Sequence, residues 1–201
     1  MLKPIGGTIY YINTSCNGKY KFYDKNTKPT EDLNKAVYYE TVEKGDSDKY
    51  FVVDTKTGVV FPKRWGCYGI STEATLDGIG SGKINTEKAL SKEDIGEYSD
   101  QTMWKYLVEE QNGKKTNGCD DWYIGSMSEL DRLRESGRVD WFIDRNKNRK
   151  PWQKKKQNYE MWSSNEVDAD NCFAWFWNPL KAKWFNWGKY EGKAVCFIRS
   201  F

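Results

Sequence analysis

The chain has no histidine among its 201 residues. Histidine is the commonest general base, the commonest metal ligand and the usual partner of a nucleophilic serine or cysteine, so its absence argues against these chemistries. There is no run of about 18 apolar residues, so no membrane-spanning helix is expected. The first residues, Met1 to Gly7, contain no apolar signal-like segment. Either the protein does not follow the usual secretory route, or the chain begins after a removed leader.

Cysteine is present but not in metal-binding or paired spacings. No Cys-x-x-Cys pair occurs, so a zinc site is not expected, and no cofactor is indicated. The odd number of cysteines favours mostly reduced, half-buried thiols in a protein made in the cytosol. A single disulfide stays open as an alternative. The five positions are Cys16, Cys67, Cys119, Cys172 and Cys196.

Two segments imitate motifs that bind phosphates. The glycine-rich stretch from Gly66 to Gly82 lacks a Gly-Lys-Ser/Thr ending and a Gly-x-Gly-x-x-Gly between strand and helix, so we interpret it as a structural loop. The segment from Asp144 to Lys156 is basic and contains Trp152, which would suit a nucleic-acid backbone. Short charge runs are usually solvated surface, and the net charge is only +3, so we do not expect nucleic acid as a partner.

The overall composition predicts one domain spanning 1–201. Mean hydropathy is −0.88 and only 38% of residues are hydrophobic, which is polar for a globular protein. The aromatic share is 16%, and a few large rings can fill a core. The patterns predict a mixed α+β fold.

Local patterns predict the following elements. Ser126 and Glu129 form a capping box that begins a helix ending at Gly137, and an apolar stripe predicts a helix from about Ser99 or Asp100 to Asn112 with Gly113 as its C′ residue. A short helical piece is expected from Thr86 to Leu90. Strands are expected at 8–12, 19–23, 36–40, 50–54 and 58–61, the last two joined as a hairpin through Thr55 to Thr57.

The last forty residues are the most unusual part of the chain. Half of the ten tryptophans lie there, interleaved with charged side chains. Some of these rings belong to a core, but a core does not need charges alternating with rings, whereas recognition surfaces use large rigid aromatic groups. The tryptophans are Trp162, Trp175, Trp177, Trp184 and Trp187.

Six segments in order carry a resemblance. They are Gly6 to Ile12, Gly78 to Thr86, Asp121 to Leu130, Trp162 to Glu166, Ala174-Trp175, and Val195 to Phe201. Together they are similar to a large bacterial and phage family of C-type-lectin-like domains, which includes the variable proteins of diversity-generating retroelements. The resemblance implies two helices packed on mostly antiparallel short strands. Residues 14–49, forming an N-terminal strand-rich insertion, and about 144–157 would be insertions.

The family resemblance implies a binding module rather than an enzyme. In such proteins the C-terminal strands, here about 162–201, receive randomised residues after template adenines are misread. Ala174, Trp175, Lys189, Val195, Arg199 and Phe201 match the family's usual tail, whereas Pro179, Ala182 and Cys196 depart from it. The implied partner is a protein or other macromolecule on a cell surface, with the chain virion-associated or displayed through another component.

Strand alternation then predicts which side chains face the ligand. If Trp175 packs inward, so does Trp177, while Ala174 faces outward with the even-numbered residues of that strand. After the turn at Ala182, the odd-numbered residues share one face, opposite Trp184 and Asn186. Outward surface positions tolerate substitution within about 0.5 kcal/mol. The candidate ligand-binding residues are Phe176, Asn178, Lys181, Lys183, Phe185, Trp187, Tyr190, Glu191, Asp168 and Asn171.

Two other functions stay open. Calcium lectins gather oxygen ligands with triplets of which Trp177-Asn178-Pro179 and Phe185-Asn186-Trp187 are only fragments, so a glycan-binding lectin would work without calcium and no metal site is expected. The fold is also shared with formylglycine-generating oxidases, which would use Cys172 and Cys196, although nothing nearby indicates a lowered thiol pKa. Asp120 and Asp121 are adjacent, so on a strand they would point opposite ways and not act as a pair.

Overall fold

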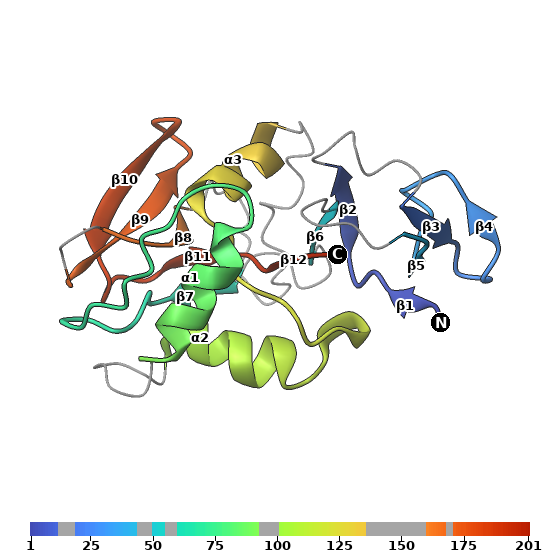
Figure 1. Cartoon of the computed structure of the whole chain (residues 1–201). Coiled ribbons are helices and arrows are strands. Elements are labelled where there is room, and N and C mark those ends of the chain that lie inside the picture. Colours follow the sequence, from blue (N-terminus) through green and yellow to red (C-terminus); the bar gives the residue numbers. More distant parts are fainter. Residues whose placement is uncertain (12–18, 44–49, 55–59, 93–100, 136–159, 168–170) are drawn as a thin grey trace, which may run out of the picture.

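The computed structural model describes residues 1–11, 19–43, 50–54, 60–92, 101–135, 160–167 and 171–201. They form a mixed α+β protein with three sheets and three α-helices in the described ranges, which confirms the predicted α+β class (Figure 1). The basic segment 144–156 and Asp168 lie outside the described residues.

The largest sheet has five strands in the order β10-β9-β8-β11-β7. Neighbouring strands are antiparallel except β8 and β11, which are parallel. Strands β9 and β10 extend from one end of the molecule as a twisted ribbon (Figure 1). The strands are β7 (Val60–Lys63), β8 (Met161–Glu166), β9 (Phe173–Asn178), β10 (Lys183–Gly188) and β11 (Lys193–Val195).

A three-stranded antiparallel sheet joins the two ends of the chain. Its central strand β6 (Tyr50–Val53) pairs with both β2 (Thr8–Tyr11) and the C-terminal strand β12 (Ile198–Ser200). Arg199 donates to both carboxylate oxygens of Asp121 at 2.7 and 2.8 Å, and to the carbonyls of Pro4 and Ile5. This bidentate contact fixes the C-terminal strand on the N-terminal segment.

A four-stranded sheet in the order β1-β5-β3-β4 contains the described part of the expected N-terminal insertion. Its strands are β1 (Lys3–Pro4), β3 (Tyr20–Tyr23), β4 (Pro29–Thr30) and β5 (Tyr38–Thr41). This sheet lies at the opposite end of the molecule from β10 (Figure 1). It packs through rings, with the ring of Tyr39 stacked on that of Phe201 at 4.0 Å between centroids.

The helices are close to the predicted ones, with informative differences. Helix α3 (Met127–Glu135) follows the expected capping box, in which Ser126 and Glu129 exchange hydrogen bonds. The helix expected to begin near Ser99 is α2 (Met103–Tyr106), which continues as the π-helix Leu107–Asn112. Gly113 has φ −61°, so it does not form the expected left-handed cap.

Helix α1 (Ser81–Leu90) is longer than the piece expected from Thr86, because Glu129 supports its first turn. The Glu129 carboxylate accepts the backbone N–H groups of Gly80 and Gly82 at 2.9 and 3.0 Å, as well as that of Ser126. These donors have no partner within their own helices, so one buried side chain joins the N-termini of α1 and α3. Burial raises the pKa of Glu129, while the N–H groups of Ser126 and Gly80 act in the opposite direction.

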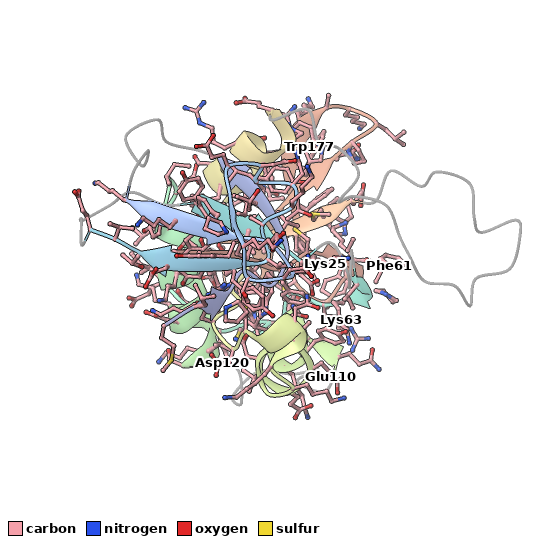
Figure 2. All side chains as sticks on the ribbon, turned by 90° about the vertical axis from the view of Figure 1, so that its right-hand side faces the viewer. Lys25, Phe61, Lys63, Glu110, Asp120 and Trp177 are labelled. Atoms are coloured by element: carbon pink, nitrogen blue, oxygen red, sulfur yellow. The ribbon has the colours of Figure 1, made fainter. Side chains whose placement is uncertain are left out.

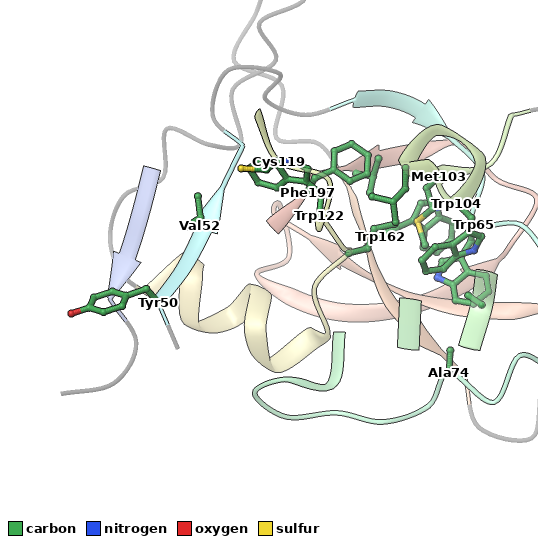
Figure 3. Packing of buried hydrophobic residues seen from close by; sticks show 14 of the residues in the cluster. Tyr50, Val52, Trp65, Ala74, Met103, Trp104, Cys119, Trp122, Trp162 and Phe197 are labelled. Atoms are coloured by element: carbon green, nitrogen blue, oxygen red, sulfur yellow. The ribbon is translucent and has the colours of Figure 1, made fainter. Parts of the chain in front are cut away.

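The largest buried cluster extends from Val52 of β6 to Trp65 and Trp104 (Figure 3). Trp65 and Trp104 meet edge to face at 5.0 Å, and both are fully buried. A second cluster, which includes Leu130 and Leu133 of α3, lies on the other side of the C-terminal strands. Both leucines are buried, as the helix pattern predicted.

The expected hairpin between residues 50–54 and 58–61 was wrong. Strand β6 pairs with β2 and β12, whereas β7 pairs with β11, so the two strands belong to different sheets. A short connection favours a hairpin only when no distant strand competes, and here the C-terminal strands pair with both. The linking residues 55–59 are outside the described ranges.

Gly82→Ala tests the junction at Glu129. Alanine normally stabilises a helix interior relative to glycine by about 0.5–1 kcal/mol. Here a Cβ would lie 2.2 Å from Glu129 Oε2 and 2.7 Å from the carbonyl oxygen of Ile124. We therefore expect a loss of about 1–3 kcal/mol in the free energy of unfolding, measured by urea denaturation. The exposed Lys83→Ala on the same helix serves as control, and equal stability of the two variants would contradict this account.

Candidate functional site

The candidate site is the β9–β10 ribbon, whose register fixes which residues share a face. Phe185 lies directly opposite Phe176, Lys183 opposite Asn178, and Trp187 opposite Ala174. We call this side of the ribbon the front face. Strand alternation predicted that these residues form rows on one face, and the register confirms it.

The exposure of the front face differs from the expectation at its centre. Phe176 was expected outward but is buried, with 5% of its surface exposed, and Ala174 is fully buried. The prediction took Trp175 as the inward residue. Trp175 is only half-buried and Phe173 on the same face is 37% exposed, so the even-numbered face of β9 is the one turned to the core, where Trp162 of β8 packs edge to face on Phe176 at 5.8 Å. Strand alternation shows which residues share a face but not which of the two faces meets solvent.

The outer strand β10 carries the exposed part of the front face. Trp187 is 52% exposed and Lys183 is exposed, while Phe185 is half-buried against the core. The Phe185 ring stacks on Phe176 at 6.0 Å. The ammonium groups of Lys181 and Lys183 lie 5.0 and 4.9 Å from the centroid of the Phe185 ring, within the range of cation–π attraction.

The turn between the strands is held by the side chain of Asn178. The Asn178 side chain accepts the N–H groups of Leu180 and Lys181 and donates to Glu160 at 2.9 Å. Its amide is therefore engaged within the protein, although it was a candidate ligand contact. Ala182 has φ +49°, a left-handed conformation that favours glycine, where the resembled family usually has glycine.

The remaining candidates surround the base of the ribbon. Tyr190 is 45% exposed, and its ring meets that of Tyr68 edge to face at 5.3 Å. It also lies against Gly188, where an added Cβ would be 2.4 Å from the Tyr190 ring. Asn171 is exposed and Glu191 is half-buried in the turn after β10.

A buried ion pair anchors the base of the ribbon. Lys189 follows β10 and is fully buried, and its ammonium pairs with Glu166 at the end of β8, which is 2% exposed. The same ammonium donates to the carbonyls of Ile70 and Cys67 and lies 4.8 Å above the Trp65 ring. Glu166 also accepts the N–H and hydroxyl of Thr72 at 2.9 Å each. Both charges are thus multiply hydrogen-bonded, as burial requires.

A second anchor lies beneath the front face. Lys193 of β11 is buried, and its ammonium lies 2.6 Å from a carboxylate oxygen of Glu160 and 3.8 Å from the Phe176 centroid. It also lies 5.3 Å from the Trp162 centroid. The stack of Phe185 on Phe176 therefore contacts a cation that is itself paired with a carboxylate.

Helix α3 covers the back of the ribbon near its tip. Trp177, labelled beside α3 in Figure 2, is buried as expected, and the Arg134 guanidinium lies 4.3 Å from its ring centroid. Trp184 packs on Trp177 and donates its indole N–H to Asp131 at 2.9 Å. The back face is thus largely used for packing at this end.

Groups that would support catalysis are placed unfavourably. Cys196 is buried, and burial raises the pKa of its thiol far above the ordinary value, which opposes thiolate formation. Cys196 carries a free thiol, and Cys172, the other candidate, is half-buried. Asp121 is paired with Arg199, whereas Asp120 pairs with Lys115 on the surface. Within the described ranges, no three Asp, Glu, Cys or His side chains come together as a potential metal site.

Comparison with protein-family models finds no match to this chain, and comparison with curated proteins finds none either. The described residues include no helix that is both long and apolar enough to cross a membrane.

Neither ion pair, Lys189 with Glu166 or Lys193 with Glu160, was predicted from the sequence. Glu166 and Lys189 entered the prediction only as parts of family-like motifs, and Glu160 was not considered. A lysine flanked by strand residues looks like a solvated charge in sequence. The signal in the sequence was the match of Lys189 to the family's usual tail. A lysine at a set position of a pattern can be a buried one, and a buried lysine needs a paired carboxylate.

Lys189→Met tests the anchor. It leaves Glu166 as an unpaired buried charge, so we expect a loss of about 3–5 kcal/mol in the free energy of unfolding, measured by urea denaturation. Lys183→Met is the matched control, because the same change at an exposed position should stay within about 0.5 kcal/mol. Similar losses in the two variants would show that the pair does not anchor the ribbon.

Proposed function

We propose that this protein is a non-enzymatic binding module that recognises a macromolecular ligand with the front face and base of the β9–β10 ribbon. One observation carries the proposal. Exposed cationic and aromatic side chains, Lys181, Lys183, Trp187 and Tyr190, lie on a ribbon whose base is held by the buried ion pair of Lys189 and Glu166. Rigid aromatic groups on a fixed support lose little entropy on binding.

The fold proposed for the module is the C-type-lectin-like fold. Its support is the order of elements: strand β2 near the N-terminus, the two capped helices α1 and α3, and then the β9–β10 ribbon followed by β11 and β12. The pairing of β2 and β12 with the same strand, β6, brings the two ends of the chain together, consistent with this assignment.

The source of the binding surface is proposed to be retroelement diversification. Members of the resembled family are rich in Asn and Ser in this part of the chain. At those positions this chain has Lys181, Lys183 and Trp187, which are exposed, and Phe185, which is half-buried. Substitution at the exposed positions costs the scaffold little. Phe176 is the exception, because its buried ring contributes to the core.

Calcium-independent glycan binding is the second candidate. It is favoured by the exposed rings of Trp187 and Tyr190, 52% and 45% accessible, on which a sugar face would stack. Binding that persists with a chelator and is competed by free oligosaccharides would select this alternative over a protein ligand.

Replacing the four exposed side chains should abolish ligand recognition without unfolding the protein. We expect the fluorescently labelled chain to bind at least one strain in a panel of bacterial cells, and the variant Lys181→Ala, Lys183→Ala, Trp187→Ala, Tyr190→Ala to lose at least about 1.4 kcal/mol, or tenfold, in affinity by flow cytometry. The matched control replaces two lysines and two apolar residues at the other end of the molecule: Lys25, Lys28, Val37 and Val42, all exposed. Unchanged binding by the first variant would contradict the proposal.

Diversification predicts a specific pattern in natural copies of the gene. Differences among copies should fall at adenines of a nearby template repeat, in codons for the exposed positions of the ribbon. The codons for Ala174, Lys189 and Arg199 should not vary, because their side chains are buried. Sequencing the 3′ region from related isolates measures this, and differences spread evenly over the gene would oppose it.

A further inference from the structure

The outer edge of β10 is open in the described part of the chain. Strand β10 is the terminal strand of its sheet and pairs only with β9. In an antiparallel pair about half of the backbone N–H and C=O groups point away from the partner. The six residues of β10 therefore present a row of hydrogen-bonding groups to a further strand. Figure 1 shows this strand at the extremity of the molecule.

The same edge carries two cations that converge on one ring. The ammonium groups of Lys181 and Lys183 lie within 5.0 Å of the Phe185 centroid. Both ammonium groups thus contact an aromatic ring, whereas those of Lys189 and Lys193 contact carboxylates. Two like charges near one point repel, and an anion placed between them would relieve that repulsion.

We propose that the ligand is an acidic polypeptide segment that adds to the edge of β10 as a sixth, extended strand. This inference rests on the proposed function and names the class of ligand. The open backbone edge favours a polypeptide over a sulfated glycan, because a glycan has no regular series of amides to match it.

The front face sets the side-chain pattern of that segment. In an added strand, alternate residues face the row Lys183, Phe185, Trp187. A carboxylate opposite Lys183 and apolar or aromatic residues opposite Phe185 and Trp187 would complement this row. Recognition thus requires an acid and apolar groups two residues apart, in either strand direction.

An alternative role for Lys181 and Lys183 is only to prevent β10 from pairing with a second copy of the chain. The two roles make different predictions. If the lysines only protect the edge, their replacement should cause self-association and leave no preference for acidic peptides. If they recognise an acid, charge reversal should reverse the preference for peptide charge.

The test uses the full chain and labelled peptides in fluorescence anisotropy. The probe is a short acetylated peptide that alternates threonine with glutamate, valine and tyrosine. The comparison peptides carry lysine in place of glutamate, or methylated amide nitrogens at alternate residues. Dextran sulfate serves as a polyanion without amides. The variants are Lys183→Glu and, as matched control, Lys25→Glu, an exposed residue that follows β3 at the opposite end of the molecule from β10 (Figure 1).

We expect the acidic peptide to bind the native chain and to bind Lys183→Glu roughly five- to twentyfold more weakly, because an exposed pair contributes about two- to fivefold and reversal adds a repulsion of similar size. The lysine peptide should prefer Lys183→Glu, the methylated peptide should not bind, and Lys25→Glu should behave as the native chain.

Several results would overturn the inference. Equal binding of the acidic and lysine peptides, tolerance of amide methylation, or binding of dextran sulfate alone would each exclude a recruited acidic strand. If one of these is found while cell binding still needs the four exposed side chains, the ligand class is wrong and the proposed function stands. If cell binding does not need them, both fail.

Discussion

The buried pair between Lys189 and Glu166 is the interaction on which the candidate site depends. It joins the end of β10 to the end of β8 and to the loop that contains Ile70 and Thr72. Burying two charges is costly unless their hydrogen bonds are satisfied, and here the surrounding carbonyls, amide and hydroxyl satisfy them. A two-stranded ribbon alone is marginally stable in water, so its shape must be imposed from its base and its covered faces. The Lys189–Glu166 pair holds the base, and on the back face Arg134 and Trp184 pack against Trp177.

This arrangement divides the ribbon into positions with different freedom. Along β9 the side chains contribute to packing: Phe176 rests on Trp162 and Lys193, and Trp177 rests on α3. Along β10 and the turn, Lys181, Lys183 and Trp187 are exposed and make few contacts that folding needs. The exposed positions of the front face are therefore concentrated on β10 and the turn, while Trp184 and Phe185 of β10 contribute to packing together with most of β9.

The sequence predicted local features well and competition between distant segments poorly. The capping box at Ser126 and Glu129 was correct because its two partners are three residues apart. The shared face of Lys183, Phe185 and Trp187 was correct because strand geometry alone requires it. Three predictions depended on distant partners: the hairpin of β6 and β7, the start of α1, and the exposure of Phe176. They were wrong because β12 paired with β6 and β11 with β7, Glu129 supported α1, and Phe176 turned to the core against Trp162.

The turn of the ribbon contains a strained residue, Ala182, beside the exposed lysines. Ala182 is held in a left-handed conformation that costs a residue with a Cβ about 1–2 kcal/mol relative to right-handed geometry. The turn keeps this geometry because Asn178 binds two of its backbone amides and is itself held by Glu160. Glu160 also pairs with Lys193, which lies beneath Phe176. The turn that places Lys181 and Lys183 beside Phe185 is therefore set by the same carboxylate that supports the ring stack. The position of the exposed cations is a property of the scaffold, so the two lysines can be exchanged for other side chains without changing where those side chains are presented.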